Sequence, residues 1–392
     1  MLRPFFLFLL LFGSFRSYSQ TISLSDNAQI YILTVAPGTE LYSQFGHSAL
    51  LVEDVNANLR VVYNYGVFDF RVDNFYLKFL RGQLPYQIGK ADLGSQLAGW
   101  RYENRDVKAQ LLNLSTQDKQ AIFDYLEVNY RPENRNYFYK FFYDNCSTRL
   151  SDVLKAVKKD SIRFDETLHA DSTYREWIDK YSRLNHNDWA DFGMDLALGI
   201  PADQKADAAG AFFLPDNLFD GLNQAQIYKD GKWQPLVSMV EPSLLFIEPI
   251  QGMSTFFTPL VVTSLFLLIY LMYWFLMQKS QKKTVFFEHL LSLLFLLTSV
   301  VLLLLWFATD HGVTSQNLNV FWTFPVFWLV YFLKKEQFKR LSILVWSSLL
   351  IFLFLSPQEI HVAYIPLILL QFAMIGRLYL AKLNSIHTTK TK

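Results

Sequence analysis

The sequence predicts an α+β domain over residues 20–250, followed by an all-α transmembrane bundle over residues 256–381. In the first part, short runs of alternating apolar and polar residues, which are typical of strands, occur beside segments with helix-capping residues. The second part is dominated by Leu, Phe, Val, Ile and Trp in stretches that approach the length needed to cross a bilayer. Together with a signal-like start, these patterns predict an exported domain tethered to a membrane.

Residues 1–19 resemble a secretory signal peptide. Arg3 supplies the positive charge, Phe5 to Phe12 forms a short apolar core, and Ser17-Tyr18-Ser19 places small residues where signal peptidase reads them. We therefore expect cleavage before Gln20 and export of the following domain. An uncleaved signal anchor is the alternative.

Three strands are expected near the start of the exported domain. Residues 29–35 form the first, and Pro37-Gly38 then turns the chain. Residues 49–53 form the second strand, and residues 60–68 alternate in polarity as the third. Because the polar segment 54–58 separates the last two strands, we expect them to form a hairpin.

Helical patterns follow the strands. Ser115-Thr116-Gln117-Asp118 has the pattern of a helix start, and Asp144-Asn145 can cap another helix. Residues 160–250 are less regular. The expected helices are an amphipathic one over Asp73 to Arg81, one from Ser115 to about Asn129, and one from Asn145 through Lys158.

The apolar second part predicts five membrane helices, with four as the alternative. The third and fourth stretches are shorter than the roughly 20 residues that span a bilayer and are compatible with a tilted or partly re-entrant path. The stretches cover residues 256–277, 284–307, 318–333, 341–356 and 360–381.

The charges of the connecting segments predict the topology. Basic residues occur in the segments 278–284 and 333–340 and in the C-terminal tail, residues 382–392, whereas the segments 308–317 and 356–361 contain no Lys or Arg. Since basic loops stay in the cytoplasm, we expect a cytoplasmic C-terminus and two outer loops on the side of the exported domain.

The outer loops and their flanks are rich in polar residues. Such residues usually solvate a loop, and the alternative is that they line a lipid or substrate entrance beneath the exported domain. The residues concerned are Asp310, His311, Asn317, Asn319, Glu359 and His361.

The composition excludes several function classes. The chain has 36 basic and 35 acidic residues, which argues against nucleic-acid binding. It contains no zinc-ligand spacing and no phosphate-cradling glycine loop, so we expect neither a metal nor a cofactor.

Cys146 is the only cysteine, so it cannot form an internal disulfide. It is expected at the first turn of a helix, after Asn145, where free backbone N–H groups and the helix dipole favour a thiolate and its own N–H can stabilise an oxyanion. Arg149 adds positive charge one turn later. Cys146 is therefore a buried small hydrophobic residue or a working nucleophile.

His47 is the best-placed candidate base for Cys146. It stands at the start of the second strand, beside Gly46, which permits a close backbone approach. An orienting partner for the imidazole is expected from the next strand, where Asn64 and Tyr65 are the candidates.

Three segments together resemble a known family. Phe45-Gly46-His47-Ser48-Ala49-Leu50, Tyr63-Asn64-Tyr65-Gly66-Val67-Phe68-Asp69-Phe70 and Tyr143-Asp144-Asn145-Cys146-Ser147-Thr148-Arg149 are similar to segments of the Lnb-type bacterial lipoprotein N-acyltransferases. The resemblance covers nearly the whole chain. It implies a circularly permuted papain-like (NlpC-type) domain, in which the histidine precedes the cysteine as in lecithin:retinol acyltransferase. It also implies Asn64 as the third catalytic residue.

The resemblance further implies an enzyme of the bacterial inner membrane with a periplasmic catalytic domain. Its acyl donor would be a membrane phospholipid and its acceptor a diacylglyceryl-modified apolipoprotein, with a Cys146 thioester between them. The alternatives are a peptidoglycan amidase or endopeptidase, a phospholipase, and a non-catalytic membrane receptor or assembly factor.

Overall fold

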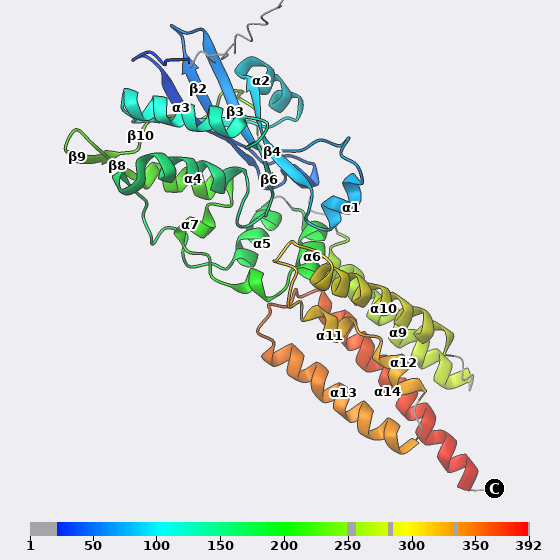
Figure 1. The fold of residues 1–392 in the computed structure, drawn as a ribbon. Helices are drawn as coiled ribbons and strands as arrows, with labels where there is room; N and C mark the ends of the chain where they lie inside the picture. Colours follow the sequence, from blue (N-terminus) through cyan, green and yellow to red (C-terminus); the bar gives the residue numbers. More distant parts are fainter. Residues whose placement is uncertain (1–21, 185, 249–255, 281–284, 333–334, 391–392) are drawn as a thin grey trace, which may run out of the picture.

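A computed structural model describes residues 22–184, 186–248, 256–280, 285–332 and 335–390. The expected signal peptide, residues 1–19, lies outside the described residues. A domain of mixed helix and sheet, called the α/β domain below, forms one end of the molecule, and a bundle of long helices forms the other (Figure 1). The strands of the α/β domain precede the long helices of the bundle in the chain.

The α/β domain is built on a seven-stranded sheet whose paired strands are all antiparallel. Its strand order is β10-β5-β1-β2-β3-β4-β6. The strands are β1 (Gln29–Val35), β2 (His47–Asp54), β3 (Leu59–Val67), β4 (Pro85–Asp92), β5 (Val107–Leu112), β6 (Asn136–Phe138) and β10 (Val237–Glu241).

The predicted hairpin is confirmed. β2 and β3 pair with Leu50 opposite Tyr63, and all of β2 from Ser48 to Val52 is buried. β2 begins at His47, two residues earlier than the apolar pattern indicates, because it pairs with β1 down to Val35. This extension fixes the backbone of His47 at the start of a central strand.

Helices cover both faces of this sheet. α3 (Thr116–Tyr130) and α4 (Cys146–Lys158) pack on one face, and α2 (Leu93–Tyr102) packs on the other. The capping boxes expected at Ser115 and at Asn145 are both formed. α4 contacts β2 and β3, so its first turn meets the strands that carry the candidate base.

The expected helix over Asp73 to Arg81 forms as the shorter α1 (Phe75–Leu80), and none of its residues is buried. Residues 160–250 are also more ordered than their patterns indicate. Besides β10, the residues of this range that the structure describes form a three-stranded sheet and four α-helices: β7 (Ile162–Arg163), β8 (Gln226–Lys229), β9 (Lys232–Pro235), α5 (Tyr174–Leu184), α6 (Asp188–Ala197), α7 (Ala208–Ala211) and α8 (Pro215–Gln224).

The bundle contains α9 (Pro259–Ser280), α10 (Phe286–Phe307), α13 (Lys335–Leu355) and α14 (Tyr364–Lys390). Among the described residues, only Pro259–Gln278 and Phe286–Phe307 are long and apolar enough to cross a membrane by themselves. The apolar parts of α13 and α14, Arg340–Leu355 and Tyr364–Leu380, are shorter. The choice between five and four spans therefore stays a prediction.

The third apolar stretch is broken into α11 (Asn319–Thr323) and α12 (Val326–Tyr331) around Pro325. Proline cannot donate a backbone hydrogen bond, so the break frees carbonyl groups in an apolar environment. The side-chain amide of Gln371 donates to the carbonyls of Trp322 and Phe324, each at 3.0 Å. α14 thus compensates for the break.

Candidate active site

The structure brings Cys146, His47 and Asn64 together near one end of the central strands β2 and β3. Cys146 is the first residue of α4, His47 is the first residue of β2, and Asn64 lies on β3. Cys146 is 7% exposed and Asn64 is 6% exposed, whereas His47 is partly exposed. The candidate nucleophile and the candidate base therefore come from different elements and lie in a mostly buried site.

A chain of hydrogen bonds orients the His47 ring. His47 Nε2 lies 3.1 Å from Oδ1 of Asn64, whose Nδ2 donates to Oε1 of Gln96 at 3.1 Å. Because the Asn64 amide donates to Gln96, its oxygen faces the ring and accepts from Nε2. That assignment leaves Nδ1 of His47 without the proton and able to accept one from the thiol.

The Cys146 thiol has a lowered pKa. Burial alone raises it, but the charge of His47 and a hydrogen bond with the His47 side chain outweigh that effect. Hydrogen bonds from the Ser48 backbone and the Ser147 hydroxyl contribute further, and the pKa falls from the usual 9.0 to about 7. The surroundings of the thiol therefore favour the thiolate, which is the nucleophilic form.

Asn145 builds the start of α4. Its Oδ1 accepts from the backbone N–H groups of Ser147 at 2.8 Å and Thr148 at 3.0 Å, and its Nδ2 donates to the carbonyls of Phe141 and Phe213. The amide is thus used within the protein, so Asn145 supports the site by capping rather than by contacting substrate. The cap does not involve the N–H of Cys146, which is the donor that an oxyanion would need.

The expectation that Tyr65 orients His47 is wrong. Its hydroxyl donates to Oδ1 of Asn129 at 2.6 Å, and its ring is buried in the core beneath α3 and α4. Successive residues of a strand point to opposite faces, so Asn64 and Tyr65 could not both reach the imidazole.

The positive charge of Arg149 is paired with a neighbouring carboxylate. Its guanidinium pairs with both carboxylate oxygens of Asp144 and lies 4.0 Å from the centre of the Tyr137 ring. Arg149 therefore fastens the loop before α4 to the helix, instead of presenting a free cation to the thiol.

Two contacts at the site were not predicted from the sequence patterns. Ser48 Oγ lies 2.8 Å from Ser147 Oγ and ties β2 to α4, and Gln96 on α2 supports Asn64. Ser48 could have been suspected because it follows His47. Gln96 lies 32 residues from Asn64 in a helix that the patterns did not predict, so nothing pointed to it.

Two asparagines of the bundle hold the α/β domain rather than line an entrance. Asn317 and Asn319 are fully buried, so the expectation that they solvate a loop or face substrate is wrong. Asn317 Nδ2 donates to the carbonyl of Leu196 at 2.7 Å, and Asn319 Nδ2 donates to that of Asp195 at 3.1 Å. These carbonyls lie in the last turn of α6, where carbonyl groups have no backbone N–H partner within the helix.

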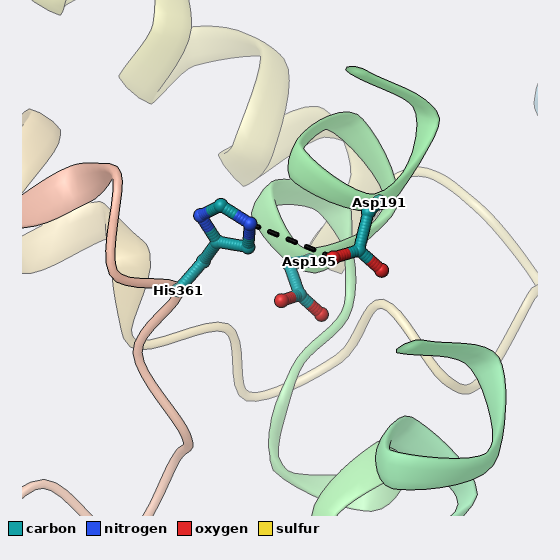
Figure 2. Close-up of side chains that lie close together, drawn as sticks. All are labelled: Asp191, Asp195 and His361. Atoms are coloured by element: carbon teal, nitrogen blue, oxygen red, sulfur yellow. Dashed lines mark ion pairs between the residues drawn. The ribbon is translucent and has the colours of Figure 1, made fainter. Parts of the chain in front are cut away.

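His361 lies at the same contact between the bundle and α6, which we call the joint. Figure 2 shows its ring directed from the loop before α14 toward Asp191 and Asp195 on α6. His361 Nε2 lies 3.6 Å from Asp191, while Asp195 pairs at 2.7 Å with the buried Arg175. The three ligand atoms lie within 4.8 Å of one another and could hold a divalent cation, although the Arg175 guanidinium already supplies positive charge there.

His311 contacts the end of α1. Its Nε2 lies 3.0 Å from the carbonyl of Leu80, and the Asp310 N–H donates to the carbonyl of Arg81 at 2.8 Å. The loop after α10 therefore contacts the end of α1. Both outer loops lie against the α/β domain, while the orientation in the membrane stays a prediction.

Comparison with known families adds to this geometry. Residues 14–189 match the model of the Lnb N-terminal periplasmic domain, and residues 251–385 match that of the Lnb transmembrane domain. No curated protein and no solved structure matches the chain. The sheet and helices described above agree with a mixed α/β domain, while the permuted papain-like topology stays a prediction. The two matched domains occur in the same order as in the sequence-based prediction, and the chain belongs to the Lnb family, as a membrane protein with a periplasmic N-terminal part.

Proposed function

We propose that the protein transfers an acyl chain from a membrane phospholipid to the α-amine of a diacylglyceryl-modified N-terminal cysteine, with Cys146 as the carrier. The observation that carries this proposal is the position of the buried Cys146 thiol at the first turn of α4, beside a His47 ring that Asn64 orients and that lowers the pKa of the thiol. A cysteine nucleophile with an oriented histidine base can carry out covalent acyl transfer. Membership in the Lnb family supports the choice of substrates.

In the first half-reaction, His47 takes the thiol proton and the Cys146 sulfur attacks an ester carbonyl of the phospholipid. The N–H of Cys146 stabilises the resulting oxyanion. The ester C–O bond then breaks, His47 returns the proton to the departing alkoxide, and lysophospholipid leaves a thioester on Cys146.

In the second half-reaction, the lipoprotein amine attacks the thioester carbonyl. His47 accepts the proton that the amine loses, and the C–S bond breaks to release the Cys146 thiolate with an amide on the lipoprotein. Protonation of the thiolate by His47 restores the starting pair. Amines react readily with thioesters, so a cysteine carrier suits transfer to nitrogen.

The attachment to the bundle supports a lipid substrate. Both proposed substrates are anchored in the membrane, and the joint of α6 with Asn317 and Asn319 holds the α/β domain at the end of the bundle. Confinement to the same surface raises the effective concentration of enzyme and substrate. A peptidoglycan amidase has no need for such an arrangement.

Intact-mass analysis of lipoprotein N-termini tests the proposal. Cells that depend on this protein should carry N-acylated lipoprotein, and Cys146→Ser or His47→Ala should replace it with the free-amine form. Ser151→Ala removes a buried hydroxyl one turn further along α4 and serves as the control that keeps activity.

Four outcomes would contradict the proposal, and three of them favour a named rival. Continued N-acylation in the Cys146→Ser variant excludes the carrier mechanism. Release of muropeptides by the wild-type protein indicates a peptidoglycan amidase, and release of free fatty acid without N-acylation indicates a phospholipase. If neither variant loses activity, the protein is a non-catalytic receptor or assembly factor.

A further inference from the structure

The surface around α1 exposes an unusual amount of apolar side chain for a domain outside the membrane. Four of its six residues are large, apolar or aromatic and 49–78% exposed, and Phe70 just before the helix is 69% exposed. Contiguous exposed apolar surface of this kind marks a contact with a membrane or a partner. The four residues are Tyr76, Leu77, Phe79 and Leu80.

Two hydrogen bonds hold the segment after α1 beside the end of a predicted membrane helix. The Asp310 N–H donates to the carbonyl of Arg81 at 2.8 Å, and Gln83 Nε2 donates to Oδ2 of Asp310 at 2.5 Å. Asp310 follows the end of α10 at Phe307 by three positions. Since α10 is long and apolar enough to span a bilayer, its end marks the membrane surface, and α1 lies beside that surface.

Gly82 makes this close contact possible. Its φ is +66°, and a Cβ at this position would lie 3.0 Å from both the backbone nitrogen and Nδ1 of His311. A larger residue would therefore be strained and would also push α1 away from the end of α10. The position of α1 is thus specified by the chain and is not that of a loose surface loop.

The charged residues within α1 and at its C-terminal end are basic, which fits an anionic lipid surface, and the acidic Asp73 lies two positions before the helix. Lys78 lies within the helix and Arg81 follows it directly, while the helix itself contains no acidic residue. Lys and Arg side chains at an interface extend toward lipid phosphates while aromatic residues lie at the headgroup level. Figure 1 shows α1 at the end of the α/β domain nearest the bundle.

A line of aromatic rings connects this surface with the active site. The ring centres of Phe70 and Phe68 are 5.1 Å apart, those of Phe68 and Tyr86 are 5.4 Å apart, and those of Tyr86 and Tyr139 are 4.6 Å apart. A Cβ on Gly66 would lie 3.6 Å from the Tyr139 ring and 3.9 Å from Cβ of Cys146. The aromatic line therefore runs from the exposed surface to the thiol.

We propose that α1 and Phe70 insert into the outer leaflet of the membrane, and that the aromatic line from Phe68 to Tyr139 guides an acyl chain from that leaflet to Cys146. The insertion stands on the exposed apolar surface and its contact with the end of α10. The guiding role rests on the proposed acyl-transfer function. The occupant of this surface is thus the lipid bilayer, rather than a protein partner.

Site-directed spin labelling tests the insertion without requiring any activity. Cys146→Ala makes the chain free of cysteine, and a single label is then introduced by Leu77→Cys. Two other leucine or valine positions provide references of comparable exposure. Leu297 on α10 is 53% exposed and should contact lipid, whereas Val55 in the β2–β3 turn is 77% exposed and should contact water.

The full chain is reconstituted in vesicles of phosphatidylethanolamine and phosphatidylglycerol. Collisions of each label with oxygen, which enters lipid, are compared with collisions with a water-soluble nickel chelate. We expect the ratio at position 77 to resemble that at 297 and to exceed that at 55 by at least several-fold. A ratio at 77 equal to that at 55 overturns the insertion, and a label from Phe79→Cys provides a second position for the same decision.

The guiding role is tested by activity with two acyl donors. The double variant Leu77→Gln and Phe79→Gln should acylate Cys146 normally from the soluble ester p-nitrophenyl butyrate, and at least about tenfold more slowly from phospholipid vesicles, because it loses apolar contact with lipid. Unchanged rates with vesicles overturn the guiding role. If the wild-type protein acylates Cys146 from neither donor, the proposed function fails, while the labelling experiment still decides the insertion.

Discussion

Nε2 of His47 lies 3.1 Å from Oδ1 of Asn64, and Gln96 fixes the direction of that amide. The bond joins the first residue of β2 to the middle of β3 across the hairpin. It holds the imidazole with Nδ1 available to the Cys146 thiol, so the tautomer of His47 is set by a residue that never touches the sulfur.

Removal of this support should raise the pKa of the thiol. In Asn64→Ala the imidazole loses its orienting bond, so the lowering that His47 exerts on Cys146 weakens. We expect the rate of Cys146 alkylation by iodoacetamide at pH 7 to fall roughly five- to tenfold, with its pH midpoint moving from about 7 toward 9. A midpoint unchanged from the wild type would show that Asn64 does not act through His47. Asn129→Ala, which removes the partner of Tyr65 instead, is the control.

The wild-type alkylation profile should itself report the His47 effect. The thiolate is the reactive form, so the rate should rise with pH through a midpoint of about 7. In His47→Ala, burial still raises the pKa of the thiol, but the imidazole that lowers this pKa is gone. The midpoint should therefore move above the usual 9.0. Mass spectrometry of the alkylated protein over pH 5–10 measures the midpoints of the wild type and of the variant. Identical profiles would contradict an effect of His47 on the Cys146 thiol.

Much of this arrangement could be predicted from local patterns. Asp144-Asn145 before an amphipathic run predicts the start of α4, because a side-chain acceptor there satisfies free backbone donors, and the structure forms that cap. The polar segment 54–58 between two apolar runs likewise predicts the β2–β3 hairpin, whose register brings Asn64 near His47. Local backbone chemistry decides these features.

The rest depends on contacts between distant segments. Gln96 supports Asn64 from a helix with little apolar pattern, and Asn317 and Asn319 bind the end of α6 from more than 120 positions away. A polar residue in a loop after an apolar stretch gives no sign that it will be fully buried against another helix. Its role is decided by the packing of the α/β domain on the bundle, which no short pattern encodes.

The buried Arg175 should be essential for stability. It pairs with Asp195 and Asp203 at 2.7 Å each and its side chain is fully buried, so Arg175→Gln leaves two carboxylates without their partner. We expect a loss of about 3–5 kcal/mol in the free energy of unfolding, seen as a lower Tm of the detergent-solubilised protein. Arg71→Gln is the matched control, because that arginine pairs with Asp69 at the surface and its loss should leave Tm unchanged. Equal Tm values for the two variants would contradict the account.

Asp179 should destabilise the protein at high pH. Burial raises the pKa of its carboxyl well above the usual range, and the nearby Asp195, Asp191 and Glu359 raise it further. The unfolded chain releases this proton near pH 4 and the folded chain retains it, so the free energy of unfolding falls as pH rises from about 4 toward the raised pKa.

Asp179→Asn removes that dependence. The variant should have a higher Tm than the wild type at pH 8 and a similar Tm at pH 4. Thermal unfolding monitored by circular dichroism at both values measures the difference, and a variant that is less stable at pH 8 would show that the ionised carboxylate has a favourable partner.

The central claim is that Cys146 carries an acyl group. Purified protein mixed with phospholipid vesicles, in the absence of any lipoprotein, should gain the mass of one acyl chain, and hydroxylamine at neutral pH should remove it because thioesters are labile to that reagent. The adduct should be absent in Cys146→Ser, should form slowly in Asn64→Ala, and should disappear when a lipidated peptide with a free α-amine is added. Transfer of acyl groups to that peptide by the Cys146→Ser variant at the wild-type rate would contradict the account.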